Sequence, residues 1–361
     1  MATIISIGTA VPKHQHLQED ILHFMQGVFG VDDAEKRKLK FLYHQSSINT
    51  RHSAIADFGL PKEEWTFIPA DKGAPFPSLE KRMEVYEKES LPLSIEAIKN
   101  CLGNTVLPSE ITHLITVSCT GMSAPGLDLQ IVEALSLPPT IFRTSVNFMG
   151  CYAAIHALKL AKLIVDGDDD AKVLVVCTEL CTLHFQKEYT ADNVSSSLLF
   201  SDGCAAALVT NGKNSKGLKL LSFYSEIANS GKDDMSWKLS SKGFLMSLSS
   251  YVPDIIKADI AGLTDRALQK SDLVKGDISH WCIHPGGRKI LESVAQALTL
   301  DKEQLHESCD VLGKYGNMSS PTILFVMKEI LAKAKDGEYL FGCAFGPGLT
   351  METLVGVMNY D

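Results

Sequence analysis

Apolar positions along the chain fall into two kinds of segment. Short runs rich in β-branched residues, such as Ile111–Ser118, Thr140–Val146 and Ala171–Thr178, predict buried strands. Longer segments in which apolar residues recur every three or four positions, such as Arg82–Leu102, predict helices. The stretch Ala54–Leu79, rich in Pro, Gly and Asp, predicts a surface loop. The pattern is typical of an α/β protein with buried sheets.

The two kinds of segment recur in both halves of the chain. The other predicted strands are Thr3–Ile7, Ala205–Thr210, Leu218–Ile227, His280–Ile283, Glu338–Phe345 and Thr350–Met358. The other predicted helices are His14–Phe29, Ala34–Gln45, Leu127–Leu135, Ala153–Asp166, Phe244–Leu263 with an interruption or kink at Pro253, Arg288–Leu298, Asp301–Gly313 and Thr322–Ala334. This order of elements predicts an internally duplicated architecture. The polar stretch Asn211–Gly217 is the expected boundary, which gives halves of residues 1–214 and 215–361.

Composition narrows the class of protein. A chain of 361 residues with 45% hydrophobic content exceeds the usual size of a single domain and can bury a large core. The formal charge of -9 and the lack of a lysine- or arginine-rich block argue against nucleic-acid binding. The chain opens directly into a strand, and no apolar stretch reaches the roughly 18 residues that span a bilayer. We therefore expect a cytoplasmic protein without a membrane segment.

The cysteines do not indicate a disulfide or metal framework. Their number, nine, is odd, and most of them lie in or beside apolar runs. No Cys-x-x-Cys pair occurs, and Cys177-x-x-x-Cys181 lacks a partner set of the zinc type. We expect no metal site.

Cys151 lies where a predicted strand turns into a predicted helix. Gly150 precedes it at the bend, and Ala153–Asp166 follows with helical spacing. The first turn of a helix has unpaired N–H groups and a positive dipole end, which stabilise a thiolate. An isolated cysteine of this kind is more often a small buried hydrophobe. The alternative is a nucleophile.

Two more polar residues lie at ends of predicted elements. His284 ends a short buried strand and is followed by Pro285 and two glycines. Asn317 stands before a helix, and alone it would be an N-cap or turn residue. Together with Cys151 they offer a nucleophile, a proton acceptor and an oxyanion donor, if all three face the same side of the core.

These motifs resemble those of the type III polyketide synthases, the chalcone synthase-like enzymes of the thiolase superfamily. The resemblance covers essentially the whole chain. Its carriers are Asn147-Phe148-Met149-Gly150-Cys151, Leu199-Phe200-Ser201-Asp202-Gly203, Trp281-Cys282-Ile283-His284-Pro285-Gly286-Gly287, Tyr315-Gly316-Asn317-Met318-Ser319-Ser320 and Phe345-Gly346-Pro347-Gly348-Leu349-Thr350. It implies a thiolase-like fold in which two similar halves form a layered α/β/α/β/α core.

The resemblance also implies a catalytic role for each of the three residues. Cys151 takes an acyl starter from coenzyme A and is held by His284 as a thiolate–imidazolium pair. His284 and Asn317 then bind the thioester oxygen of malonyl-CoA while it loses carbon dioxide. Two hydrogen-bond donors stabilise the resulting enolate without a metal.

The resemblance assigns further residues to the substrates. Phe200 and Phe244 match two gatekeeping aromatic residues, although Phe244 could equally be core packing. Gly286 and Gly287 match neighbours of the pantetheine arm. Four positions match the cavity lining: Cys119, His184, Met235 and Ser319. The first three differ from the plant enzymes and favour a bacterial-type enzyme with a reshaped cavity, whose product could close as a pyrone, a resorcinol or a phloroglucinol.

The resemblance implies coenzyme A thioesters as substrates, no prosthetic group, and a homodimer with Ala124–Gly126 at its interface. The basic residues Lys36, Arg37, Lys38 and Lys40 are in about the right region for the coenzyme A phosphates. They could equally form a solvated helix face. Two alternative functions are a ketoacyl synthase III-like enzyme that condenses once and a catalytically inactive thiolase-fold scaffold.

Overall fold

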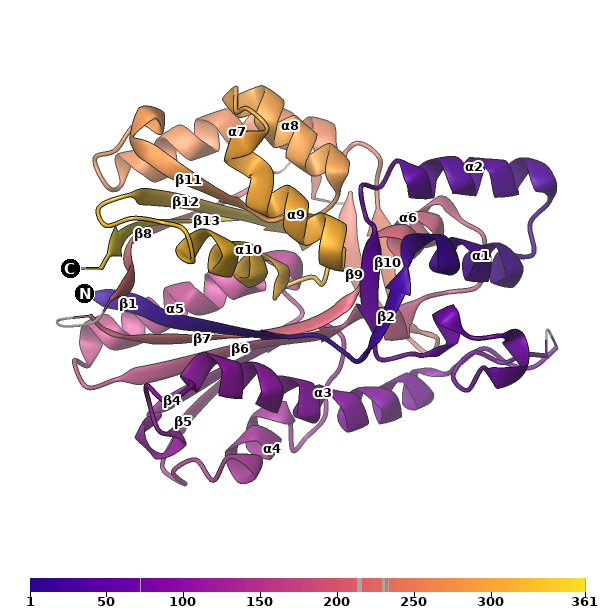
Figure 1. Ribbon diagram of the computed structural model, residues 1–361, viewed down its shortest axis with the longest axis horizontal. Coiled ribbons are helices and arrows are strands. Elements are labelled where there is room, and N and C mark those ends of the chain that lie inside the picture. Colours follow the sequence, from indigo (N-terminus) through magenta and orange to yellow (C-terminus); the bar gives the residue numbers. More distant parts are fainter. Residues whose placement is uncertain (72, 213–215, 229–230, 233, 361) are drawn as a thin grey trace.

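The core of the molecule is built on one nine-stranded sheet that consists of two half-sheets. The computed structural model describes residues 1–71, 73–212, 216–228, 231–232 and 234–360. Nine strands join in the order β11-β12-β13-β8-β1-β7-β6-β4-β5. Their bounds are β1 Ala2–Ala10, β4 His113–Ser118, β5 Phe142–Asn147, β6 Lys172–Leu180, β7 Asp202–Asn211, β8 Gly217–Ile227, β11 Ile278–Ile283, β12 Tyr339–Gly346 and β13 Thr350–Asn359. In the described part of the chain, β1 and β8 pair at two positions alone, Thr3 with Lys219 and Ile4 with Leu218. Two half-sheets therefore meet at this joint (Figure 1).

The strand order shows the internal duplication that the sequence predicts. In the first half-sheet the order is β4-β6-β7-β1, with β5 added at the edge, and in the second it is β11-β12-β13-β8. The first pair of strands is parallel in each half, and the other two pairs are antiparallel. Strands β4 and β11 are therefore equivalent, and so are the helices that precede β6 and β12.

Helices fill the space between the half-sheets and cover their outer faces. Two helices, α5 (Ala153–Gly167) and α10 (Thr322–Leu331), lie between the half-sheets, while α3 (Leu79–Leu102) and α4 (Leu127–Ala134) cover one outer face and α7 (Val252–Gln269) and α8 (Arg288–Leu298) the other (Figure 1). Alternate residues of a strand enter different cores, because successive side chains point to opposite faces. In β6, Val173 and Val175 pack in the central core and Leu174 and Val176 in an outer one. The layered α/β/α/β/α arrangement is thus confirmed.

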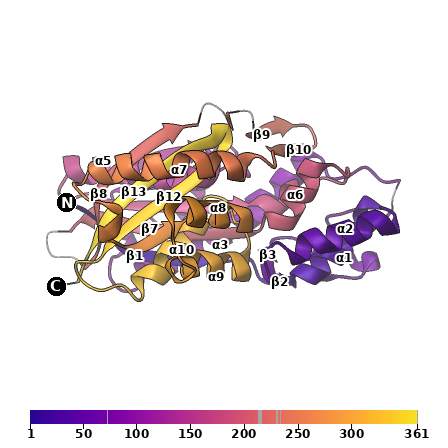
Figure 2. The ribbon, with the colours of Figure 1, turned by 90° about the horizontal axis from the view of Figure 1, so that it is seen from above.

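The remaining elements gather at one end of the molecule, opposite the chain termini (Figure 2). They are β2 His14–Leu17, α1 Gln18–Phe29, α2 Asp33–His44, β3 Thr50–Ser53, α6 Ala191–Leu199, β9 Met235–Ser240 and β10 Gly243–Leu248. The helix α9 (His306–Tyr315) precedes α10. No helix in the described residues is both long enough and apolar enough to cross a membrane.

Three expectations about the elements are wrong. The segment Phe244–Leu263 is not a kinked helix: its start belongs to a hairpin of β9 and β10, and α7 begins with Pro253 in its first turn, where a missing N–H costs nothing. Residues 14–17 of the expected first helix pair with β3 as a strand. The strand β5 is exposed at all its residues except Val146, because it lies at the edge of the sheet. The expected boundary Asn211–Gly217 includes residues 213–215, which lie outside the described residues.

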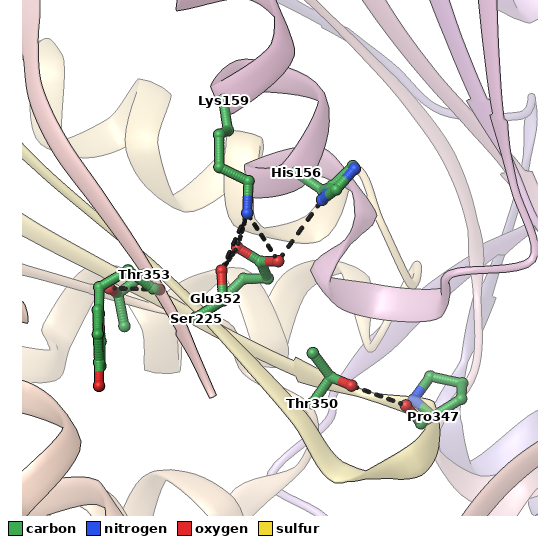
Figure 3. Close-up of polar contacts among 8 residues, drawn as sticks. His156, Lys159, Ser225, Pro347, Thr350, Glu352 and Thr353 are labelled. Atoms are coloured by element: carbon green, nitrogen blue, oxygen red, sulfur yellow. Dashed lines mark hydrogen bonds and ion pairs between the residues drawn. The ribbon is translucent and has the colours of Figure 1, made fainter. Parts of the chain in front are cut away.

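A buried carboxylate ties α5 to the second half-sheet. Glu352 of β13 accepts hydrogen bonds from Lys159 Nζ at 2.9 and 3.0 Å and from Ser225 Oγ at 2.6 Å (Figure 3). His156 Nδ1 lies 3.5 Å from the same carboxylate. At the start of β13, Thr350 Oγ1 donates to Pro347 O at 3.4 Å. This hydrogen bond ties the strand to the loop of Pro347, which packs against Gly150 just before α5.

Glu352→Gln should lower the free energy of unfolding by about 1–3 kcal/mol, because it leaves Lys159 without its buried counter-charge. Urea denaturation measures the change. The control is Asp310→Asn, which removes an exposed partner of Lys314 and should cost about 0.5 kcal/mol or less. Equal effects of the two substitutions would contradict a structural role for Glu352.

Candidate active site

The turn that carries Cys151 is held by close packing. Cys151 lies in a short 3-10 turn, Gly150–Tyr152, directly before α5. Gly150 has a φ of +76°, and a Cβ there would lie 2.2 Å from Pro347 Cδ. A side chain at this position is therefore excluded both by the backbone and by the neighbouring loop. The Gly150 N–H donates to Cys119 Sγ at 3.0 Å. The predicted strand-to-helix turn is confirmed.

His284 follows β11 and is buried, with 1% of its surface exposed. Its backbone N–H donates to Cys343 O at 2.8 Å, which fixes the main chain at the end of the strand. Neither ring nitrogen has a hydrogen-bond partner in the described part of the chain. A buried, unpartnered imidazole is costly, so this ring is available for a ligand or for a neighbouring thiol.

Asn317 is fixed on both its backbone and its side chain. Its N–H donates to Leu199 O and its carbonyl accepts from Ser201 N–H, each at 2.9 Å, so that it lies beside Phe200. Its Oδ1 accepts from Ser319 N–H at 2.8 Å, and its Nδ2 donates to Gly286 O at 3.2 Å. An amide NH₂ carries two hydrogens, so one N–H remains beside the Cys151 sulfur, where a ligand can accept it.

The three residues line one cavity of about 260 Å³. Of the other site residues that the sequence predicts, six share this lining: Phe200, Cys119, Met235, Ser319, Gly286 and Gly287. The duplication explains the convergence. Cys119 and His284 follow the equivalent strands β4 and β11, and Cys151 and Asn317 precede the equivalent helices α5 and α10.

Two of the predicted site residues do not line this cavity. His184 and Phe244 line a smaller cavity of about 40 Å³, and their rings stack at 4.3 Å. His184 Nε2 donates to Thr120 O at 2.6 Å, while its Nδ1 accepts from Phe244 N–H at 3.1 Å, so the ring is neutral and fixed. Burial lowers the pKa of His184 to about 3.

Four residues form the wall between the two cavities: Cys181, Phe200, Trp237 and Met246. Sequence reasoning missed three of them, all except Phe200. Trp237 lies two residues after Met235 in β9, and Met246 lies two residues after Phe244 in β10. The alternation of side chains along a recognised hairpin would have identified both.

A buried carboxylate holds loops from both halves around the cavity. Glu179, at the end of β6, accepts from Cys119 N–H, Thr120 Oγ1 and Ser320 Oγ at 2.7–2.9 Å. Burial raises the pKa of this carboxyl to about 7, and its three donors oppose the shift. A single carboxylate at the end of an apolar strand was the signal for it in the sequence.

Sequence comparison decides the family. The N-terminal domain of the chalcone and stilbene synthases matches residues 1–213, and the C-terminal domain of the same family matches residues 220–358. This chain belongs to the chalcone and stilbene synthase family. It is a type III polyketide synthase, and thus an acyltransferase that performs decarboxylative Claisen condensation.

Relatives and solved structures agree along nearly the whole length of this polyketide synthase. The alpha-pyrone synthesis polyketide synthase-like Pks18 of Mycobacterium tuberculosis is 30% identical over 98% of this chain and 91% of that protein. The C-terminal type III polyketide synthase domain of Steely1 from Dictyostelium is 27% identical, with a TM-score of 0.90 over 99% of both chains. PKS-I of the brown alga Ectocarpus siliculosus is also 27% identical, with a TM-score of 0.88 over 99% of this chain and 98% of that one. The fold is thiolase-like.

In this synthase, burial disfavours charge on Cys151 and on His284 when each is taken singly. Burial raises the pKa of the Cys151 thiol to about 11, although hydrogen bonds to Ser319 and Asn317 oppose the shift, and burial lowers the pKa of His284 to about 3. The thiol donates to Ser319 Oγ at 3.5 Å. The thiolate–imidazolium pair that the resemblance implies stays a prediction: burial opposes each charge singly, and the opposite charge of the partner would offset this cost. To form it, the Cys151 proton must move to the unpartnered His284 ring.

The pH dependence of Cys151 alkylation should reveal this proton transfer. A thiolate beside an imidazolium in a buried site is stabilised by a strong Coulomb attraction. In the native protein the alkylation rate of Cys151 with iodoacetamide should therefore reach its plateau already by about pH 7 and rise no further at higher pH. In His284→Ala only burial remains, so the rate should keep rising with pH toward the raised pKa of about 11. Mass spectrometry separates Cys151 from the exposed Cys309, which serves as the reference thiol. Identical pH profiles in both proteins would refute the transfer.

Proposed function

We propose that this synthase loads an acyl starter from coenzyme A onto Cys151, extends it with malonyl-CoA and cyclises the product. The observation that supports this most directly is the convergence of Cys151, His284 and Asn317 on one cavity from equivalent positions of the two halves. Coenzyme A thioesters are substrates in this reaction, and the proposal requires no prosthetic group. The cytoplasmic location of the enzyme stays a prediction.

In the loading step, His284 accepts the Cys151 proton and the sulfur attacks the acyl carbon of the starter. Coenzyme A leaves as its thiol after taking the proton back from His284. The result is an acyl thioester on Cys151. Apolar residues that line the cavity, among them Met235, Trp237 and Met246, exclude water from this thioester.

In the extension step, malonyl-CoA loses carbon dioxide and leaves an enolate. The free N–H of Asn317 Nδ2 and a protonated ring nitrogen of His284 donate to the enolate oxygen. The enolate carbon then attacks the acyl group on Cys151, whose thiolate leaves. The free Cys151 is available for another round.

Cavity shape limits the length of the product. The wall of Trp237 and Met246, backed by the stacked His184 and Phe244, separates about 260 Å³ of reaction space from the smaller cavity. The name of the Mycobacterium relative makes an alpha-pyrone the first cyclised product to look for.

Incubation with malonyl-CoA and a panel of acyl-CoA starters, read by mass spectrometry, tests the function itself. Products with two or more added acetate units and a closed ring are expected. A single extension would favour a ketoacyl synthase III-like reaction. The absence of both product and acyl adduct on Cys151 would favour a scaffold.

Substitution of Asn317 and His284 should separate the two steps. Asn317→Ala should still accept a starter, seen as a mass adduct on Cys151, while malonyl-CoA decarboxylation falls on the order of 100- to 1,000-fold through loss of one donor. His284→Ala should impair both steps, since it removes the base as well as a donor. Native decarboxylation by Asn317→Ala would leave Asn317 as a turn residue only.

The exposed edge strand β5 supports a homodimer. In the single chain Phe142 is 69% exposed, and an edge strand with apolar exposure is a pairing surface. Ala124–Gly126, expected at the interface, lies on the loop between β4 and α4.

Light scattering should give about twice the chain mass of 39.4 kDa. Phe142→Asp should shift the enzyme toward the monomer, because it places a charge on the pairing edge. Leu239→Asp on β9, at an equally apolar exposed position, should not. An active monomer of the native chain at micromolar concentration would exclude the dimer.

A further inference from the structure

The charge of the reaction cavity is confined to two residues. Arg288 and Lys289 are the charged side chains among the described residues that line it, and no Asp or Glu takes part in the lining. The chain as a whole carries a formal charge of -9. An acidic protein that lines a cavity with cations alone presents a local site for anions.

Both cations lie in the first turn of α8, directly after the loop that carries His284. Gly286 and Gly287 separate them from His284, and exposure rises along this segment from the buried His284 through the half-buried Arg288 to the exposed Lys289. The buried end of the cavity therefore holds the reacting groups, and the solvent end holds the positive charge.

The backbone at this point also favours an anion. Arg288 and Lys289 open the helix α8, whose N-cap Gly287 has no side chain to satisfy the first N–H groups. Unpaired N–H groups and the positive end of the dipole bind anions. At the inner end of the same cavity, the buried His284 ring has no partner at either nitrogen, an independent sign that a ligand enters here.

The two cations have few partners in the described structure: Arg288 makes one ion pair, and the side chain of Lys289 makes none. Lys289 makes no hydrogen bond or ion pair there, and Arg288 lies 3.6 Å from Glu292 while its Nε lacks a hydrogen bond. On α2, Lys36 pairs with Asp33 at 3.2 Å and Lys38 with Glu35 at 3.5 Å. None of the basic residues of α2 lines the cavity.

We propose that Arg288, Lys289 and the first turn of α8 bind the phosphate of the phosphopantetheine arm and so direct its thioester toward Cys151. The inference rests on the proposed function and assigns the phosphate site to α8 instead of α2. The same phosphate chemistry occurs in coenzyme A and on an acyl carrier protein. Guanidinium and ammonium groups each form charge-assisted hydrogen bonds to phosphate oxygens.

Substrates with and without the phosphate test this site. For each enzyme, kcat/KM is measured with malonyl-CoA and with malonyl-N-acetylcysteamine, which keeps the thioester but has no phosphate. In R288Q/K289Q the ratio of the two values should fall on the order of 10-fold or more, through a higher KM for malonyl-CoA. The matched control on α2, K36Q/K38Q, should keep the native ratio. Malonyl carrier protein in place of malonyl-CoA shows which source of the phosphate depends on the site more strongly.

An unchanged ratio in R288Q/K289Q with both phosphate-bearing substrates would overturn the phosphate site. So would an equal loss with the phosphate-free substrate, since that indicates a structural role at the start of α8. A larger effect of K36Q/K38Q would move the site to α2. Failure of the native enzyme to turn over any malonyl thioester would instead refute the proposed function.

Discussion

The enclosure of two helices between the half-sheets is the constraint on which this structure depends. Most residues of α10 are buried, and α5 buries the face that carries its alanines, Ile155 and Leu158. The enclosed faces of these helices have no room for polar groups, so polar residues lie on the other face, as His156 and Lys159 do, or at the helix ends. The residues proposed to react lie at those ends. Cys151 and Asn317 are placed by the same packing that forms the core.

Enclosure also sets the electrostatics of the site. Because burial disfavours charge on Cys151 and on His284 alike, a charge on either residue needs a compensating charge on the other or on a substrate. Glu179 sits at the same depth, and burial raises the pKa of its carboxyl to about 7, so it also resists ionisation. Its three hydrogen bonds keep the loops of the two halves in register around the cavity.

Local signals predicted the parts of the site that depend on short stretches of chain. The turn at Cys151 could be read from one glycine between a strand and a helix, and the position of His284 from the end of a buried strand. The hairpin of β9 and β10 could not, because the apolar residues from Phe244 onward also fit a helical period and Pro253 suggests a kink within one helix. Because the hairpin was not predicted, Trp237 and Met246 were not identified as residues that line the cavity. The position of His184 depends on stacking against Phe244, a contact between residues 60 positions apart that no local pattern contains.

The duplicated strand order has a consequence for the residues that the two halves carry at equivalent positions. Loops of the same topology carry Cys119 and Cys151 in the first half but His284 and Asn317 in the second. A symmetric pair of loops would supply two nucleophiles or two acid–base groups, and neither set completes a condensation. Catalysis requires the two copies to differ where they meet, while the core requires only that both remain apolar. The two halves are therefore alike in backbone topology and differ in the residues that line the site.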